Sequence, residues 1–375
     1  MSFQDRVAIY RNIETLRGRP LVAYVTSSRA NGGGMMAADV LPLFARQLLE
    51  IDSTAKAIDL LIVSTGGDPM VSWRVASMLR DRFEKVGALL PYAAYSAATL
   101  LALGADEIVM HPFSNMGPVD PQLTYQKRLP GQDPETIHFG SEDLRNFLEF
   151  VRTDVGISDQ EQLERAFELV CKDVGSIPIG VAKRSAQLAL SLGEKLLSLH
   201  MGDKGRARAI AEALNKSFFH HGYPVARVEA AGIGLPVIHP QPELEGAMWS
   251  AWEDIESEMQ CGRPFTPVEL VFSDPNLAAM LSTVPQVQMP ANLPAQLAQQ
   301  VLSNVLQQVQ VVATPHIEYT LFQAALESVR ASARFETRGR INAVRQPDMN
   351  LAINVLPVTA GWSYTRTATQ EVHLD

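Results

Sequence analysis

Short apolar runs alternate with amphipathic stretches along the first third of the chain. The apolar runs are residues 20–27, 58–64, 86–92 and 107–111. The second of them (IDLLIVS) is nearly unbroken, which is typical of a strand buried on both faces. The stretch over residues 69–85 has helical spacing, with Asp68 at the N-cap position and Pro69 as its first residue. This alternation predicts βαβ units and a parallel sheet covered by helices.

The middle of the chain has a different pattern. Residues 117–140 are punctuated by proline and glycine and predict a hairpin or an excursion from the sheet. Residues 142–217 have mainly helical spacing, and the predicted breaks lie near Gly156, Gly175 and Gly202. The chain then returns to the core over residues 218–236, with a short helix that ends at the glycines of residues 232–234.

The character of the sequence changes again after Pro240. A predicted helix over residues 244–259 carries Trp249 and Trp252 on one face, as expected of a packing stripe. A stretch rich in Gln, Pro and Ala follows, and alternating β-formers begin near residue 311. We therefore predict two units: a domain over residues 1–240, and a C-terminal extension over 241–375 that contains a helix, a linker and a small β-rich module.

Charge and cysteine content exclude several classes of protein. The formal net charge is −9, which argues against a nucleic-acid partner because phosphate contacts require a basic face. The two cysteines, Cys171 and Cys261, have no partners at metal-binding spacing and make no disulfide framework. No G-x-G-x-x-G fingerprint follows a strand, which argues against a dinucleotide cofactor. We expect no metal and no other cofactor.

One uncharged stretch, residues 86–105, has the length of a membrane span. Pro91 and Ser96 interrupt it, and the turn chemistry splits it into a buried strand and a short helix. The first six residues are polar and charged, unlike a signal peptide. We expect a cytoplasmic protein without a membrane span.

The candidate chemistry lies in two turns about thirty residues apart. Residues 64–69 (STGGDP) and 95–99 (YSAAT) each follow a predicted strand and open a helix. Acyl transfer requires a serine at a sharp turn and backbone N–H groups that face a developing oxyanion. Ser96 could supply the first, and the N–H groups of Gly67 and Ala97, supported by Gly66, the second. The alternative interpretation is that Ser96 is only an N-cap and the Gly-Gly turn only a turn.

Four motifs in a fixed order resemble one known family. They are residues 65–69 (TGGDP), 95–99 (YSAAT), 105–110 (ADEIVM) and 117–122 (GPVDPQ), and a later segment, 220–224 (HHGYP), resembles the family's closing segment. The family is the serine dehydrogenase proteinases, which group with signal peptide peptidase A and the Clp protease proteolytic subunit. The resemblance covers residues 19–237. It implies an α/β fold of the crotonase type, a right-handed ββα spiral, and self-assembly into trimers or their multiples. It also implies that Ser96 is the nucleophile and that Gly67 and Ala97 form the oxyanion hole.

The general base is where this sequence departs from the Clp pattern. Residues 115–120 (NMGPVD) contain no histidine, and His111 and His138 flank the stretch without matching the motif. The signal peptide peptidase branch uses a lysine, which can act as a base when burial lowers its pKa. Among Lys127, Lys172 and Lys183, we predict Lys183, because it lies in the apolar helical segment 179–192. The adjacent His220 and His221 have poor metal geometry, and we expect a structural role for them.

These observations predict a serine peptidase that acts on a peptide or protein through an acyl-enzyme, with Ser96 as nucleophile and Lys183 as base. One alternative is a catalytically silent oligomeric scaffold that uses the same fold to bind a partner. Another is a crotonase-type enzyme for acyl-CoA thioesters, in which the same hole would stabilise an enolate.

Overall fold

A nine-stranded sheet forms the centre of the molecule in a computed structural model that describes residues 3–127, 135–216, 220–282, 294–308, 311–346 and 350–367. Five strands of this sheet run parallel to one another. They are β1 (Leu21–Thr26), β2 (Ala57–Val63), β3 (Lys85–Leu90), β5 (Glu107–Met110) and β10 (Val237–Ile238). The expected parallel sheet is confirmed, and the fold is of the α/β class.

Helices cover both faces of the parallel strands. Leu60 and Ile62 of β2 face one core cluster, which contains α2 (Leu41–Leu49), α3 (Pro69–Arg82) and α4 (Ala97–Leu103). Leu61 and Val63 face a second cluster, which contains α1 (Phe3–Arg17) and α10 (Pro242–Met259). Successive side chains of a strand point to opposite faces, so a strand covered on both sides must be apolar throughout. The nearly unbroken apolar run of β2 has this cause, and its one charged residue, the buried Asp59, is paired with Arg17 at 2.7 Å.

A small second sheet lies beside the main one. It consists of β4 (Ala93–Ala94), β6 (Asn115–Met116) and β9 (Val225–Ala226), with β6 parallel to β4 and antiparallel to β9. The chain passes from β3 to β4 and then into α4, which makes one ββα unit. Ser64, just beyond β2, bridges to Ala94 before α3 begins, which repeats the pattern. The predicted ββα organisation is thus present.

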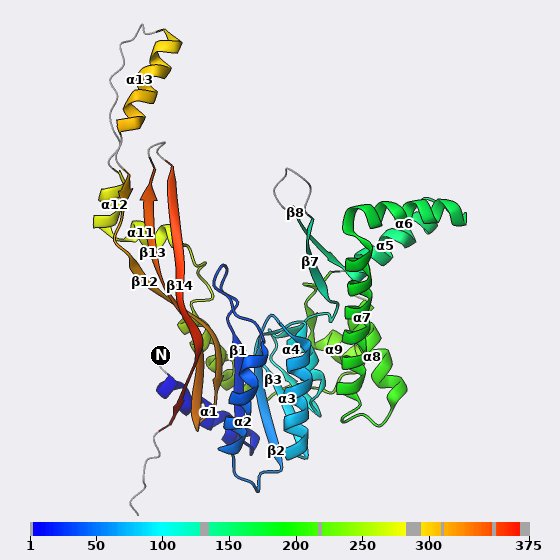
Figure 1. Cartoon of the computed structure of the whole chain (residues 1–375). Helices are drawn as coiled ribbons and strands as arrows, with labels where there is room; N and C mark the ends of the chain where they lie inside the picture. The colour runs from blue at the N-terminus through cyan, green and yellow to red at the C-terminus, as the bar shows by residue number, and fades with distance from the viewer. Residues whose placement is uncertain are drawn as a thin grey trace, which may run out of the picture.

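A helical arm follows the small sheet and projects from the core in Figure 1. It begins with the antiparallel hairpin of β7 (Gln122–Lys127) and β8 (Glu135–Gly140). The helices of this region are α5 (Ser141–Thr153), α6 (Gln160–Val174), α7 (Ser176–Leu197) and α8 (Lys204–Lys216), and α9 (Arg227–Ile233) follows β9. Gly175 has φ of 92° between α6 and α7, a conformation that favours glycine, so the predicted break there is confirmed.

The C-terminal strands continue the main sheet. β12 (Ile317–Glu327) pairs antiparallel with β1, and β13 (Ala331–Arg345) pairs with β12, β11 (Val312–Ala313) and β14 (Leu351–Arg366). Three helices precede these strands: α11 (Pro267–Ser273), α12 (Pro275–Ser282) and α13 (Ala295–Gln308). Of the predicted linker, residues 284–293 and 309–310 lie outside the described residues. The antiparallel β-structure expected near the C-terminus is present, and it is joined to the core through β1.

A buried ion network fastens this extension to the N-terminal helix. Arg6 of α1 is fully buried and donates hydrogen bonds of 3.0 and 2.9 Å to Glu327 of β12. It also donates to Asp254 and Glu258 of α10, at 2.6 and 2.7 Å. Tyr10 donates to the same Glu327 at 2.8 Å. Burial opposes the charge of Arg6, but the hydrogen bonds and charge of Glu327 keep its pKa above the usual value. The network therefore links α1, α10 and β12, which lie far apart in the sequence.

Candidate active site

Ser96 occupies a strained turn between β4 and α4. Its backbone has φ of 53° and ψ of −115°. These angles match the first central position of a type II′ turn, which glycine dominates because a Cβ is crowded there. The Ser96 side chain is half-buried and makes no capping hydrogen bond to the helix that follows. The interpretation of Ser96 as an ordinary N-cap therefore has no support in its geometry.

Side chains from neighbouring elements hold this turn in place. Ser72 of α3 donates to the carbonyl oxygen of Ala97 at 2.6 Å. Thr99 donates to the carbonyl oxygens of Ala94 and Gly117, at 2.7 and 2.9 Å. Both hydroxyl-bearing residues are buried. Strained backbone persists when the surrounding structure over-determines it, and such positions cluster at functional sites.

The Gly66–Gly67 turn lies directly against Ser96. A Cβ on Gly66 would stand 2.8 Å from the Cβ of Ser96, and one on Gly67 would stand 2.2 Å from the carbonyl oxygen of Met36. Both glycines also have positive φ, 110° and 148°. The two turns meet because Ser64, at the end of β2, exchanges two backbone hydrogen bonds with the segment of β4. Only glycine fits at either position.

The pairing of its neighbours directs the backbone N–H of Gly67 away from Met36. Met36 donates its N–H to Gly66 at 2.8 Å and accepts that of Asp68 at 2.9 Å. In such a bridge the intervening residue directs its own N–H to the opposite side. Within the described residues, the N–H groups of Gly67 and Ala97 have no acceptor. Two free donors next to an uncapped serine hydroxyl are the arrangement that acyl transfer requires.

Lys183, the predicted base, is held by a different part of the molecule from Ser96. It is exposed on α7 and lines a groove of about 490 Å³ whose other side chains are mainly apolar. No hydrogen bond joins it to Ser96 in the described part of the chain. Lys172 is also exposed, on α6, and the side chain of Lys127 lies outside the described residues. The assignment of a lysine base stays a prediction.

The histidines near the small sheet differ from one another. His111 is buried and stacks on Trp249 with ring centroids 5.0 Å apart, and burial lowers its pKa. Trp249 and Trp252 thus pack inside the chain, against His111 and Tyr92. The side chain of His138 lies outside the described residues.

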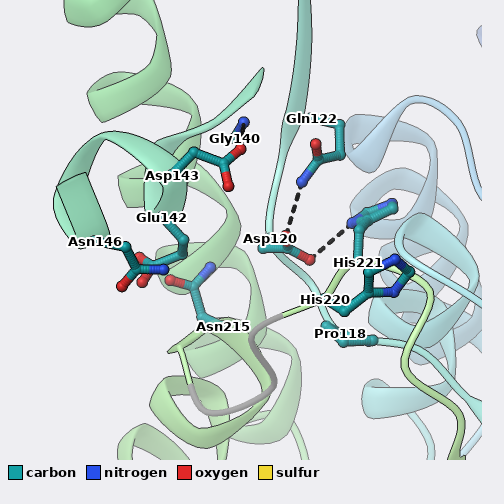
Figure 2. A pocket seen from close by; sticks show the side chains of 10 residues that line it. All are labelled: Pro118, Asp120, Gln122, Gly140, Glu142, Asp143, Asn146, Asn215, His220 and His221. Atoms are coloured by element: carbon teal, nitrogen blue, oxygen red, sulfur yellow. Dashed lines mark hydrogen bonds and ion pairs between the residues drawn. The ribbon is translucent and has the colours of Figure 1, made fainter. Parts of the chain in front are cut away.

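His221 has an ionic partner that the sequence did not reveal. Its Nδ1 lies 2.7 Å from Oδ1 of Asp120, and this hydrogen bond and charge raise the pKa of His221 (Figure 2). The pair lines a cavity of about 170 Å³ that also contains Gln122 and Asn215. Ser96 is not among the residues that line this cavity. The sequence predicted only a structural role for His221 and did not indicate this ion pair.

Two further kinds of site, a metal centre and a membrane span, were sought in the described residues. Within the ranges that the structure covers, no cluster of three or more His, Cys, Asp or Glu side chains could hold a metal ion. Over the same ranges, no helix combines the length and apolar character that crossing a bilayer requires.

Comparison with known proteins identifies a family that part of the chain matches. Residues 46–130 match the family of ClpP-like SDH-type serine proteinases. Two uncharacterized proteins of Methanocaldococcus jannaschii are each 28% identical to the chain, over 181 and 188 residues. The matches cover 48% and 50% of this chain, and 51% and 56% of those relatives. The chain thus spans about half the length of the curated relatives it matches.

Solved structures with some similarity include two forms of the membrane-bound stomatin-specific protease 1510-N. One is a serine-to-alanine mutant (16% identity, TM-score 0.36, 57% of this chain and 80% of that chain). The other is a lysine-to-alanine mutant in complex with a substrate peptide (17%, 0.35, 56% and 74%). ClpP1 from Listeria monocytogenes is 11% identical, with a TM-score of 0.32, over 64% of this chain and 98% of that one. The resemblance that the motifs predicted is confirmed at the level of sequence: residues 46–130, which include Gly66, Gly67, Ser96 and Ala97, carry the pattern of the ClpP-like SDH-type serine proteinases.

Proposed function

We propose that this protein is a serine peptidase in which Ser96 is the nucleophile and the N–H groups of Gly67 and Ala97 form the oxyanion hole. The observation that carries the proposal is the conformation of Ser96. Its φ is 53°, and its hydroxyl makes no capping hydrogen bond to the helix. A strained, uncapped serine next to two unpaired N–H donors has no evident structural purpose. The family match over residues 46–130 supports the peptidase chemistry.

In the proposed reaction, the Ser96 hydroxyl oxygen attacks the carbonyl carbon of the scissile peptide bond and loses its proton to a base. The carbonyl oxygen becomes an oxyanion, which accepts hydrogen bonds from Gly67 and Ala97. Collapse of this intermediate releases the amine and leaves an ester on Ser96, which water then hydrolyses. The hole stabilises charge that develops only in the transition state, and removal of one such donor typically slows a reaction by 10²–10³-fold.

Labelling with a fluorophosphonate, read by intact mass, tests this proposal. We expect one adduct on the wild-type protein and none on Ser96→Ala. Ser198→Ala is the matched control, since Ser198 is an exposed serine at the end of α7 whose hydroxyl only bonds a helix carbonyl. It should label like the wild type. A wild-type protein that is folded and never labelled would contradict the proposal and would favour the scaffold alternative.

We also propose that the protein assembles into a cytoplasmic homo-oligomer, a trimer or a multiple of one. The arm supports this, because α6 has no buried residue and both α5 and α6 expose large apolar side chains, among them Phe150, Phe167 and Leu169. Light scattering of the purified protein measures the assembly directly, and a monomer at all concentrations would contradict it.

A further inference from the structure

We propose that the C-terminal extension helps to set the oxyanion hole, and that Gln323 of β12 is a positioning residue for Gly67. The inference rests on the proposed function, because it concerns the hole of the same site. Three observations carry it: a β-bulge at Gln323, the hydrogen bonds of that residue to the loop of residues 27–36, and the pairing of this loop with the Gly66–Gly67 turn.

Gln323 is the extra residue of a bulge in β12. Phe322 and Ala324 lie opposite consecutive residues of β13, which leaves Gln323 without a counterpart on that strand. A bulge redirects a side chain, and bulges are over-represented next to active sites. Here the bulge presents a backbone carbonyl and a side-chain amide to the loop that follows β1.

This loop, residues 27–36, is bonded to Gln323 at two points. The N–H of Ser27 donates to the Gln323 carbonyl oxygen at 2.8 Å, and Gln323 Nε2 donates to the Gly33 carbonyl oxygen at 2.8 Å. A carbonyl oxygen only accepts, so the amide nitrogen must face Gly33. The amide oxygen accepts from the hydroxyl of Thr337 on β13 at 2.6 Å. Both ends of the side-chain amide are therefore fixed.

Gly34 allows the loop to pass close to the bulge. A Cβ on Gly34 would stand 2.0 Å from the Gln323 carbonyl oxygen. That oxygen belongs to the backbone, so a side chain at this position would force the loop away from β12. The extension also holds the start of the loop, where the N–H of Phe265 donates to the Ala30 carbonyl oxygen at 2.8 Å.

Met36, at the end of the same loop, holds the Gly66–Gly67 turn. Its N–H donates to the Gly66 carbonyl oxygen at 2.8 Å, and its own carbonyl oxygen accepts the N–H of Asp68 at 2.9 Å. These bonds fix the peptide groups on both sides of Gly67, and with them the direction of the Gly67 N–H. A hole stabilises an oxyanion only when its donors point at the place where the charge develops.

The connection from the bulge to the hole is short. Gly34 meets β12 and Met36 meets the turn, and Met35 alone lies between them. Two residues of chain span at most about 7 Å. Close-packed protein interiors transmit strain, so a displacement of the loop at β12 should reach Gly67.

A purely structural role for these contacts makes a different prediction. If Gln323 only stabilises the fold, its loss lowers the free energy of unfolding and leaves the labelling of the folded protein unchanged. If it positions Gly67, the folded protein itself reacts more slowly, because a displaced donor stabilises the transition state less while binding of the probe is retained. The two roles therefore differ in the limiting rate of labelling.

The test measures fluorophosphonate labelling of Ser96 against probe concentration in the full chain. Gly34→Ala should lower the limiting rate by about 10²-fold, as a misplacement of about 1 Å typically does, and leave the half-saturating concentration within about twofold of the wild type. Gln323→Glu should lower the limiting rate by about tenfold, because it keeps the shape and the bond from Thr337 but a carboxylate cannot donate to Gly33.

The double variant tests the path between the two positions. If Gln323 acts through the loop, Gln323→Glu should add less than about twofold to the loss caused by Gly34→Ala, since changes within one network are not additive. Two independent losses would multiply. That result would overturn the assignment of Gln323 as a positioning residue.

Two matched controls make the same chemical changes elsewhere. Gln299→Glu adds the same charge to the same extension, on the exposed helix α13. Gly180→Ala adds a methyl group on α7 that meets no neighbouring atom within 4 Å. Both variants should label at the wild-type rate. Thermal unfolding of each variant separates a loss of rate from a loss of fold, and if Gly34→Ala does not fold, the limiting rate of Gln323→Glu decides.

The outcomes separate this proposal from the peptidase proposal. If Gly34→Ala and Gln323→Glu fold and label at the wild-type rate, the positioning role is overturned and the peptidase proposal stands. A change confined to the half-saturating concentration would also overturn it, because the loop would then contribute to binding of the probe and not to the hole. If the wild type itself never labels, the peptidase proposal fails and this one fails with it.

Discussion

The Ser96 turn and the helical arm are built in opposite ways. The turn is enclosed by the parallel sheet, with Ala97 and Ala98 buried behind it and hydroxyls of α3 and α4 bonded to its carbonyls. Among the described residues, the outer part of the arm, α5 and α6, contributes no side chain to the core clusters, whereas α7 and α8 pack on the core, for example through Leu196 and Ile210. Strained geometry persists only where packing over-determines it, and the turn has that packing while α5 and α6 do not.

The small sheet connects two further segments, those of Asp120 and His221, to the strand that leads to Ser96. β6 and β9 each pair with a neighbour of the same sheet that contains β4. Asp120 follows β6 and His221 precedes β9, so both residues are positioned by strands of the packed core. Four changes would break or sharpen the comparison between the turn and the arm.

The largest expected effect is at Ser96. Ser96→Gly should abolish fluorophosphonate labelling, because no nucleophile remains. It should also raise the free energy of unfolding by about 1 kcal/mol, since relief of a strained φ is worth about 1–3 kcal/mol and glycine returns part of it as unfolded-state entropy. Urea unfolding of Ser96→Gly and Ser96→Ala measures the difference, because alanine keeps the strain. Equal stability of the two variants would show that the turn is not strained.

The next effect concerns the network that joins the extension to the core. Arg6→Ala leaves Glu327 and Asp254 buried without their cation, and breaking a buried ion pair on one side typically costs about 3–5 kcal/mol. The control is Lys56→Ala, which removes an exposed pair with Glu84 and should leave stability unchanged. Chemical denaturation of both proteins gives the comparison. A small effect at Arg6 would mean that the extension unfolds separately from the parallel sheet.

A smaller loss is expected at the Gly-Gly turn. Gly67→Ala forces a Cβ to 2.2 Å from the Met36 carbonyl at a positive φ, so we expect a loss of about 2–3 kcal/mol and weaker labelling. Gly246→Ala is the matched control, because Gly246 lies exposed inside α10 with no atom within 4 Å of the added Cβ. That change should stabilise the protein by about 0.5–1 kcal/mol. Differential scanning calorimetry measures both changes in stability. A stabilised Gly67→Ala variant would contradict the close approach of Gly67 to the Met36 carbonyl.

The smallest effect belongs to the arm. Leu169 of α6 is 59% exposed, so Leu169→Ser should change the free energy of unfolding of one chain by no more than about 0.5 kcal/mol. Hydrogen exchange should also show α6 opening far more readily than β2 or α4. If the arm joins copies of the chain, the same substitution should weaken assembly in analytical ultracentrifugation. Slow exchange in α6 of a monomer would contradict the contrast between the two regions.

Local signals in the sequence account for much of the fold. Asp68 caps α3 through a hydrogen bond of 2.8 Å to the N–H of Met70, with Pro69 as the first helical residue. The apolar run of residues 58–64 predicted a strand covered on both faces. Such features depend on a few neighbouring residues, so a sequence displays them directly. The two functional turns were visible for the same reason, because their Ser and Gly residues stand at ends of βα units.

Long-range pairing was not visible in this way. The β-rich extension was predicted as a module, whereas the structure pairs β12 with β1, some 300 positions earlier in the chain. The expectation of a structural role for His221 rested on the adjacent His220 and on the return of the chain to the core, and it gave no partner for the side chain. Its partner Asp120 is 101 residues away, and only the pairing of β6 with β9 brings the two together.

The sequence by itself therefore determined the parallel α/β core, the capped helices and the two turns at which Ser96 and Gly67 lie, because each depends on local backbone preference and the periodicity of burial. Only the tertiary structure decided that Gly66 contacts Ser96, that Asp120 contacts His221 and that Lys183 faces solvent. These depend on which strand edges meet, and that choice is made by the packing of the whole core.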